Sequence, residues 1–130
     1  MSKVKAKDVD LGLREVKHQR HWILCGNIPK KVGDLPFVGT DSEGRFNWWT
    51  VTPPKTDYWG AHQVLGRAYA FDLLDLVHNP EAEAPEHIIS FIADAMMRWR
   101  RTVEPCAGEA IPHGFFEVLS EYLVTGRVNR

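Results

Sequence analysis

A pair of prolines, Pro53-Pro54, divides this chain into two parts with different residue patterns. Before the pair, the sequence is rich in glycine, aromatic and basic residues and has short apolar runs typical of strands. After it come three long segments with helical apolar periodicity and few glycines. Proline cannot donate a hydrogen bond to a β-ladder, so the pair also ends the last strand. This pattern predicts an α+β fold in which a small antiparallel sheet, built on a hairpin, packs against three C-terminal helices.

The length and composition favour one globular domain. The chain has 130 residues, of which 44% are hydrophobic and 25% are charged, and these are ordinary values for a protein with a single buried core. We therefore predict a single domain over residues 1–130. Within it, residues 1–8 are expected to be flexible, residues 9–54 rich in β-structure, and residues 55–130 helical.

The β-rich part is expected to begin with two short strands and to end in the hairpin. The predicted strands cover residues 9–13, 21–25, 37–38 and 46–51. In the last of these, Trp48 and Trp49 point to opposite faces because side chains alternate along a strand. We therefore expect both faces of the hairpin to be covered.

The helical part is expected to contain helices over residues 57–78, 85–103 and 113–125, with a loop over residues 104–112. Thr56 is a suitable N-cap for the first helix, and Gly126 is a suitable left-handed cap for the last. The second helix has the clearest apolar stripe, which includes Ile92 and Trp99, and its opposite face carries Asp94 and Arg98. We predict that the first two are buried and that the last two are exposed.

Asp72 is the most unusual residue of the first helix. The helical period places its carboxylate within an apolar seam that includes Leu65, Ala68 and Leu76. A carboxylate in such a seam either meets a cation or has a raised pKa. We expect a structural partner, with Arg67, Arg98, Arg101 or an arginine of a second subunit as candidates. The alternatives are a helix that turns this side to water and, more remotely, a small enzyme centred on Asp72 and a histidine.

A group of aromatic residues lies around the proline pair. Trp48, Trp49, Tyr58 and Trp59 stand close in sequence to Arg45. Together these five residues are a candidate binding surface, because aromatic rings and arginine are enriched where proteins bind peptides, other proteins or single-stranded nucleic acid. The structural alternative, which we favour, is that the aromatic rings cover the core between sheet and helices.

Charge is unevenly distributed along the chain. Residues 1–31 hold eight basic and three acidic side chains, whereas the remaining 99 residues hold eight basic and fourteen acidic ones. A basic arm on an acidic body suits either a nucleic-acid contact or docking of the arm on its own body. If nucleic acid binds, the candidate phosphate contacts are Lys3, Lys5, Lys7, Arg98 and Arg101.

The chemistry-bearing residues form no catalytic or metal-binding signature. Cys25 and Cys106 lack metal-type spacing, and the histidines are not accompanied by a second pair of ligands. We therefore expect no metal, no cofactor and no catalytic residue, and we favour a non-enzymatic protein.

The resulting hypothesis is an interaction protein that acts through aromatic and helical surfaces. Large apolar side chains on the first and third helices favour self-association, with a homodimer as the commonest form. A nucleic-acid-binding accessory protein is the alternative. Because the chain has no membrane-length apolar run and no secretory leader, we expect a cytoplasmic protein with free thiols.

Overall fold

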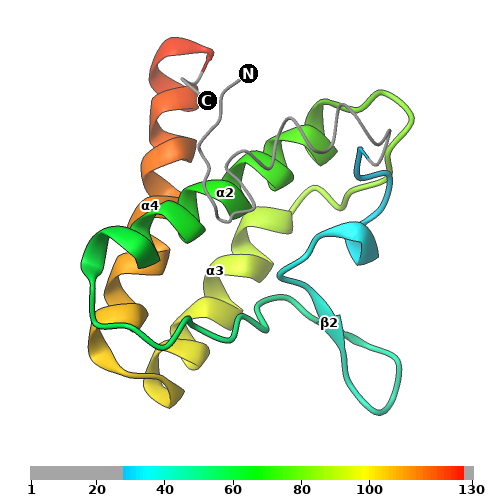
Figure 1. Ribbon diagram of the computed structural model, residues 1–130. Helices are drawn as coiled ribbons and strands as arrows, with labels where there is room; N and C mark the ends of the chain where they lie inside the picture. Colours follow the sequence, from blue (N-terminus) through cyan, green and yellow to red (C-terminus); the bar gives the residue numbers. More distant parts are fainter. Residues whose placement is uncertain (1–27, 128–130) are drawn as a thin grey trace.

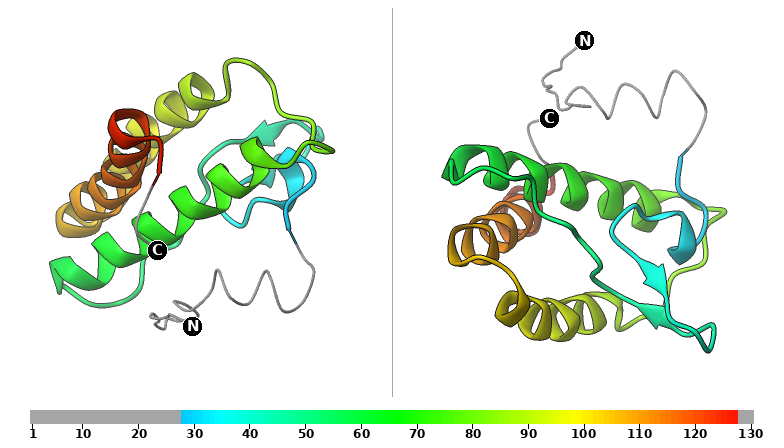
Figure 2. Two further views of the ribbon diagram at one scale, coloured as in Figure 1. Left: turned by 90° about the horizontal axis from the view of Figure 1, so that it is seen from above. Right: turned by 60° about the horizontal axis from the view of Figure 1, so that its bottom comes forward.

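The computed structural model describes residues 28–127, which form a small hairpin followed by three α-helices. The helices are α2 (Trp59–His78), α3 (Ile88–Trp99) and α4 (Pro105–Thr125), and they surround the core together with the hairpin (Figures 1 and 2). The predicted α+β fold with a small hairpin and three C-terminal helices is confirmed. The strands predicted over residues 9–13 and 21–25 lie outside the described residues, as do residues 1–8, which were expected to be flexible, and the three candidate lysines.

The hairpin is shorter than its apolar pattern suggested. Strand β2 (Gly39–Thr40) pairs antiparallel with β3 (Phe46–Asn47), in the register Gly39 to Asn47 and Thr40 to Phe46. The turn between them is held by Asp41, whose side-chain oxygen accepts hydrogen bonds from the backbone N–H groups of Glu43 and Arg45 at 2.9 Å. Gly44 has a φ of 81°, a value that glycine adopts without strain. A short 3-10 turn, η1 (Val32–Asp34), precedes the hairpin.

Past β3 the chain leaves the ladder but still packs on the core. Trp49 is 2% exposed, whereas Phe46 on the opposite face is 45% exposed. The expectation that both faces of the hairpin are covered is therefore wrong at Phe46. Thr50 still binds the first arm, because its N–H and its hydroxyl both donate to the carbonyl of Phe37, at 2.8 and 3.1 Å. So short a ladder leaves side-chain packing as the main anchor of the hairpin.

That anchor is a cluster of aromatic rings at the centre of the molecule. Trp49 lies with its ring centroid 4.9 Å from Phe37, 5.2 Å from Phe115 of α4 and 6.0 Å from Trp99 of α3. The indole N–H of Trp99 also donates to the carbonyl of Val51 at 2.8 Å. These tilted and edge-on contacts are the favoured geometries of aromatic pairs. They tie the hairpin to two helices at once.

Helices α2 and α4 cross with their backbones nearly in contact. A Cβ built on Gly66 would lie 1.9 Å from the carbonyl oxygen of Ile111, and one on Gly114 would lie 2.0 Å from that of Gln63. Neither position can hold a larger residue unless the helices move apart. The two glycines therefore set the distance between α2 and α4, which the sequence analysis did not anticipate.

The third helix begins eight residues earlier than predicted. Of the segment expected to be a loop, residues 104–112, all but the N-cap Glu104 belong to the first part of α4. Glu104 caps the helix by accepting a hydrogen bond from Ala107 N–H at 3.1 Å, and Pro105 occupies the first turn, where no N–H is needed. Pro112 lies inside the helix and removes one backbone hydrogen bond. Burial of Ala107, Ala110 and Ile111 offsets that loss.

The other two helices begin and end within three residues of the predicted limits, except at the end of α3. There the last turn is a 3-10 helix, η2 (Arg100–Thr102). Helix α2 begins at Trp59, so the predicted N-cap Thr56 lies three residues before the helix. Its hydroxyl accepts a hydrogen bond from the N–H of Tyr58 at 3.2 Å. Gly126 is the left-handed cap of α4, with a φ of 74°, as predicted.

Candidate functional site

Within residues 28–127, an apolar trough lies between α3 and α4. It consists of two adjoining hollows of about 590 and 580 Å³ that share Phe116 and Ser120. The first hollow lies between the end of α2, the start of α3 and the end of α4, and the second continues along α3 and α4. We call the two together the α3–α4 trough.

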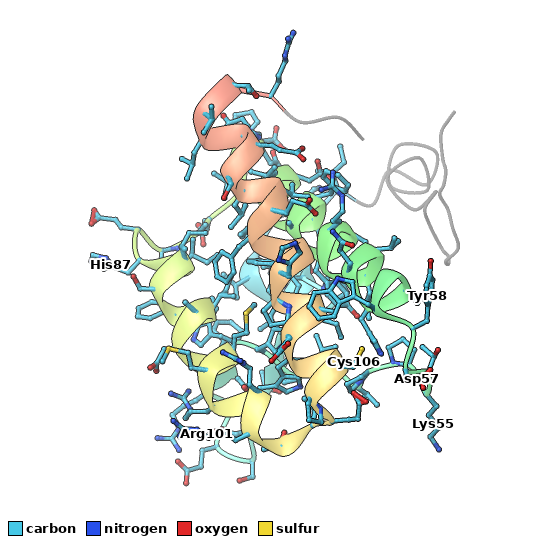
Figure 3. The ribbon with its side chains drawn as sticks, turned by 90° about the vertical axis from the view of Figure 1, so that its left-hand side faces the viewer. Lys55, Asp57, Tyr58, His87, Arg101 and Cys106 are labelled. Atoms are coloured by element: carbon cyan, nitrogen blue, oxygen red, sulfur yellow. The ribbon has the colours of Figure 1, made fainter. Side chains whose placement is uncertain are left out.

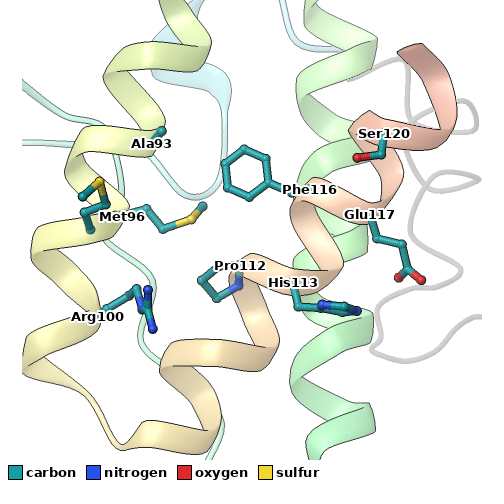
Figure 4. A pocket seen from close by; sticks show the side chains of 9 residues that line it. Ala93, Met96, Arg100, Pro112, His113, Phe116, Glu117 and Ser120 are labelled. Atoms are coloured by element: carbon teal, nitrogen blue, oxygen red, sulfur yellow. The ribbon is translucent and has the colours of Figure 1, made fainter. Parts of the chain in front are cut away.

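Each of the two helices presents one stripe of side chains to the trough. The α3 side, with the first residue of η2, consists of Ile88, Ile89, Ala93, Met96, Met97 and Arg100. The α4 side consists of Pro112, His113, Phe116, Glu117, Leu119, Ser120, Tyr122 and Leu123. Both sets follow the three- and four-residue spacing of one helix face. Figure 4 shows Phe116 projecting from α4 towards α3 at the middle of the trough.

The rims of the trough expose large apolar side chains to solvent. Leu123 is 82% exposed, Met97 is 61% exposed, Val77 is 51% exposed and Ile89 is 41% exposed. Single exposed apolar residues are common, but a contiguous set around a groove marks an interaction site. The groove is apolar because Ile88, Met96 and Leu119, which line it, belong to the core.

The two ends of α3 differ in charge. Glu81, Glu83 and Glu86 are exposed before its first turn, and Arg98, Arg100 and Arg101 are exposed at its other end. Figure 3 shows His87 and Arg101 at opposite ends of the helix. Arg98 is paired with Asp94 at 2.5 Å, which confirms that both of these side chains face outward. Of these charged side chains, Glu86 lines the trough at one end and Arg100 lines it at the other, where Glu117 of α4 also lies.

A polar network between α2 and α4 fixes the wall of the trough. Glu117 accepts hydrogen bonds from Gln63 and Arg67, both at 2.9 Å, and Arg67 also pairs with Glu121 at 3.3 Å. Partial burial opposes ionisation of Glu117, but the two donors and the Arg67 charge outweigh it, so its pKa lies below the usual value. Glu117 is thus held ionised and oriented.

The five residues of the candidate aromatic surface do not form one surface. Trp49 belongs to the core, whereas Tyr58 is 69% exposed and Trp59 is 40% exposed at the start of α2. Arg45 and Trp48 lie on the hairpin, and Figure 1 shows the hairpin and the start of α2 at opposite sides of the molecule.

The hairpin nevertheless contributes to a smaller aromatic patch. The ring of Trp48 lies 5.4 Å from that of Phe46 and 5.1 Å from that of Phe91 of α3. Sequence reasoning missed Phe91, because it is distant along the chain from the two hairpin residues.

Asp72 lies in the interior, as its place in the apolar seam predicted. Its exposed fraction is 0%. Of its proposed partners, Arg98 binds Asp94, and Arg67 binds Glu117 and Glu121. The partner of Asp72 therefore stays a prediction.

Cys106 has the surroundings of a neutral thiol. Its Sγ donates to the carbonyl of Asp57 at 3.3 Å. Desolvation, followed by the negative charges of Glu104, Asp57 and Glu109, raises the pKa of this thiol. A nucleophilic cysteine needs the opposite environment.

The described histidines are not brought together as metal ligands. Within residues 28–127, no group of three or more His, Cys, Asp and Glu side chains is arranged to hold a metal ion. His62 is fully buried and its Nε2 lies 2.8 Å from the carbonyl oxygen of Thr56. This contact gives His62 a structural role.

Comparison with known proteins identifies no relative. No protein family, curated protein or solved structure is significantly similar to the chain. In the part of the chain that the structure describes, no helix has the length and apolar character needed to cross a membrane.

Proposed function

We propose that this protein is a non-enzymatic interaction protein that binds a protein partner in the α3–α4 trough. The observation that carries the proposal is the pair of adjoining apolar hollows with exposed Met97, Ile89 and Leu123 on their rims. Helix-lined apolar grooves bind the apolar face of a partner helix through residues spaced three and four apart. A cytoplasmic location remains part of the proposal.

The size of the trough supports a helical partner. The stripe from Ile88 to Arg100 spans about 18 Å at the rise of an α-helix, which corresponds to about three turns. Three turns of an amphipathic helix provide three or four apolar anchors on one side. Leaving Met97 and Leu123 in water has no stability advantage for the isolated chain, whereas covering them on binding is favourable.

Photo-crosslinking in cells tests this proposal. A benzophenone-bearing amino acid at position 97 should form a crosslink to protein, and the crosslink should disappear when Ile89→Glu is added. The matched control is the same amino acid at position 64, because Val64 is 44% exposed on α2 and does not line the trough. Equal crosslinking at positions 97 and 64, or crosslinks unaffected by Ile89→Glu, would contradict the proposal.

Nucleic-acid binding is the second candidate, and the exposed arginines at the end of α3 are what favours it. Arg98 and Arg101 would supply phosphate contacts, together with Lys3, Lys5 and Lys7. The pairing of Arg98 with Asp94 weakens this reading, because that carboxylate already neutralises one of the cations. Contacts to several phosphates would make affinity fall steeply with salt. Absence of binding to DNA or RNA at low salt would remove this candidate.

A further inference from the structure

We propose that the occupant of the trough is a second copy of this chain, with the two α3 helices antiparallel about a two-fold axis at Ala93. This inference rests on the proposed function, since it names the partner of the same trough. The resulting assembly is a four-helix arrangement of α3 and α4 from each copy, in which the exposed stripe of one α3 fills the trough of the other.

The first argument is the symmetry of the trough-lining residues from Glu86 to Arg100 that are not buried, a set that leaves out the buried Ile88 and Met96. Glu86, Ile89, Ala93, Met97 and Arg100 all line the trough. Their positions are symmetric about residue 93: Ile89 and Met97 lie four residues away on either side, and Glu86 and Arg100 lie seven away. In an antiparallel pair centred on residue 93, each member of the stripe therefore faces its counterpart in the other copy.

The second argument is the chemistry of the facing residues. Ile89 lies opposite the partner subunit's Met97, and these are the two most exposed apolar side chains of α3 that line the trough. The two-fold axis repeats this contact, so the dimer contains it twice. At the centre, Ala93 faces the partner's Ala93, and a small side chain there lets two helices approach closely. The contact thus has apolar residues near its middle, as the core of a protein interface requires.

The third argument is charge, which is independent of the apolar stripe. An antiparallel pair brings the acidic end of one α3 to the basic end of the other, so Glu86 lies opposite the partner subunit's Arg100. A parallel pair would place like charges together at both ends, which is unfavourable. The apolar spacing and the charge distribution therefore both favour the antiparallel orientation. A partner other than this chain would not require the residues of α3 to be placed symmetrically about position 93.

Charge-exchange variants followed by light scattering test the inference. At micromolar to millimolar concentration the wild-type protein should approach twice the 14.9 kDa mass of one chain. Glu86→Arg and Arg100→Glu should each raise the dissociation constant of the dimer by about 10- to 100-fold, because each exchange turns two attractive contacts per dimer into repulsive ones. An equimolar mixture of the two variants should regain the wild-type affinity, since both contacts of the mixed dimer again join opposite charges.

The apolar contact has its own variants. Ile89→Glu and Met97→Glu should each yield a protein near 14.9 kDa, whereas Val64→Glu on α2 should dimerise like the wild type. Circular dichroism and a thermal melt show whether each variant is folded, and the exposure of these positions gives no reason for unfolding.

Three results would overturn the inference: a mass near 14.9 kDa at every wild-type concentration, a dimer unaffected by Met97→Glu, or a charge-variant mixture as weak as its components. A monomer that still forms trough-dependent crosslinks to another protein would refute the second copy alone. A monomer without such crosslinks would refute the proposed function as well.

Discussion

The close crossing of α2 and α4 should make Gly66→Ala strongly destabilising, although the same substitution usually stabilises a helix. Replacing glycine by alanine inside an exposed helix stabilises it by up to about 1 kcal/mol. At Gly66, however, the new Cβ would lie 1.9 Å from the carbonyl oxygen of Ile111 and 2.9 Å from the backbone N of Phe115. Both neighbours are backbone atoms of a helix, so neither can rotate out of the way.

The size of the effect follows from the separation that the methyl group demands. Real Cβ contacts are essentially never shorter than 3.0 Å, so the two helices must move apart by about 1 Å at the crossing. A gap of that size forfeits a quarter to a half of the dispersion energy of every atom pair across the contact. After subtracting the gain in helix propensity, we expect Gly66→Ala to lower the free energy of unfolding by about 2–4 kcal/mol.

Urea unfolding measures this loss, and Gly60 of the same helix offers a matched control. A Cβ at Gly60 would lie 2.9 Å from the ring of Tyr58, which is 69% exposed and can rotate away. Gly60→Ala should therefore leave the free energy of unfolding unchanged or raise it by up to about 1 kcal/mol.

Gly114 supplies a second test, because its Cβ would clash at the same crossing. Once one methyl group has separated the helices, a second costs less, so the Gly66→Ala/Gly114→Ala double variant should lose less stability than the sum of the two single variants. Equal stability of Gly66→Ala and Gly60→Ala would refute the close crossing of α2 and α4.

Three further predictions concern the core and two titratable groups. Trp99→Ala should lower the free energy of unfolding in urea by about 3–5 kcal/mol, since Trp99 is 8% exposed and packs on Trp49 of the aromatic cluster. A loss below about 1 kcal/mol would contradict this. The pKa of Glu117 is lowered in the folded protein, so the stability that its carboxylate contributes is present above the usual pKa of 4.5 and is lost as the pH falls through the lower folded-state pKa. Glu117→Gln should therefore flatten the decline of the free energy of unfolding as the pH falls. An unchanged decline would argue against this role of Glu117. In a Cys25→Ser variant, Cys106 is the one cysteine left. Its raised pKa should make its alkylation at pH 8 slower in the folded protein than in urea. Equal rates would show that folding does not perturb the thiol.

The fold class could be read from the sequence because each of its signals is local. Pro53-Pro54 marks the boundary between the hairpin and the helices, although β3 already ends at Asn47. The apolar period of α3 identified Ile92 and Trp99 as buried without knowledge of what covers them. The helical period of α2 placed Asp72 in an apolar seam, and its side chain is buried. The start of α4 was misjudged because Pro112 and Gly108 are breakers in local terms, whereas tertiary burial of the segment outweighs their cost.

What the tertiary structure alone decided is how distant residues meet. The sequence could not say that Gly66 faces Ile111, that Trp49 enters the core while Trp48 contacts Phe91, or that α3 and α4 leave a trough between them. A helical pattern indicates which side of a helix is apolar, but it does not distinguish a core face from a binding face, because both consist of apolar residues. Only the packing of the other elements determines which apolar side chains are covered within one chain and which remain on the rim of the trough.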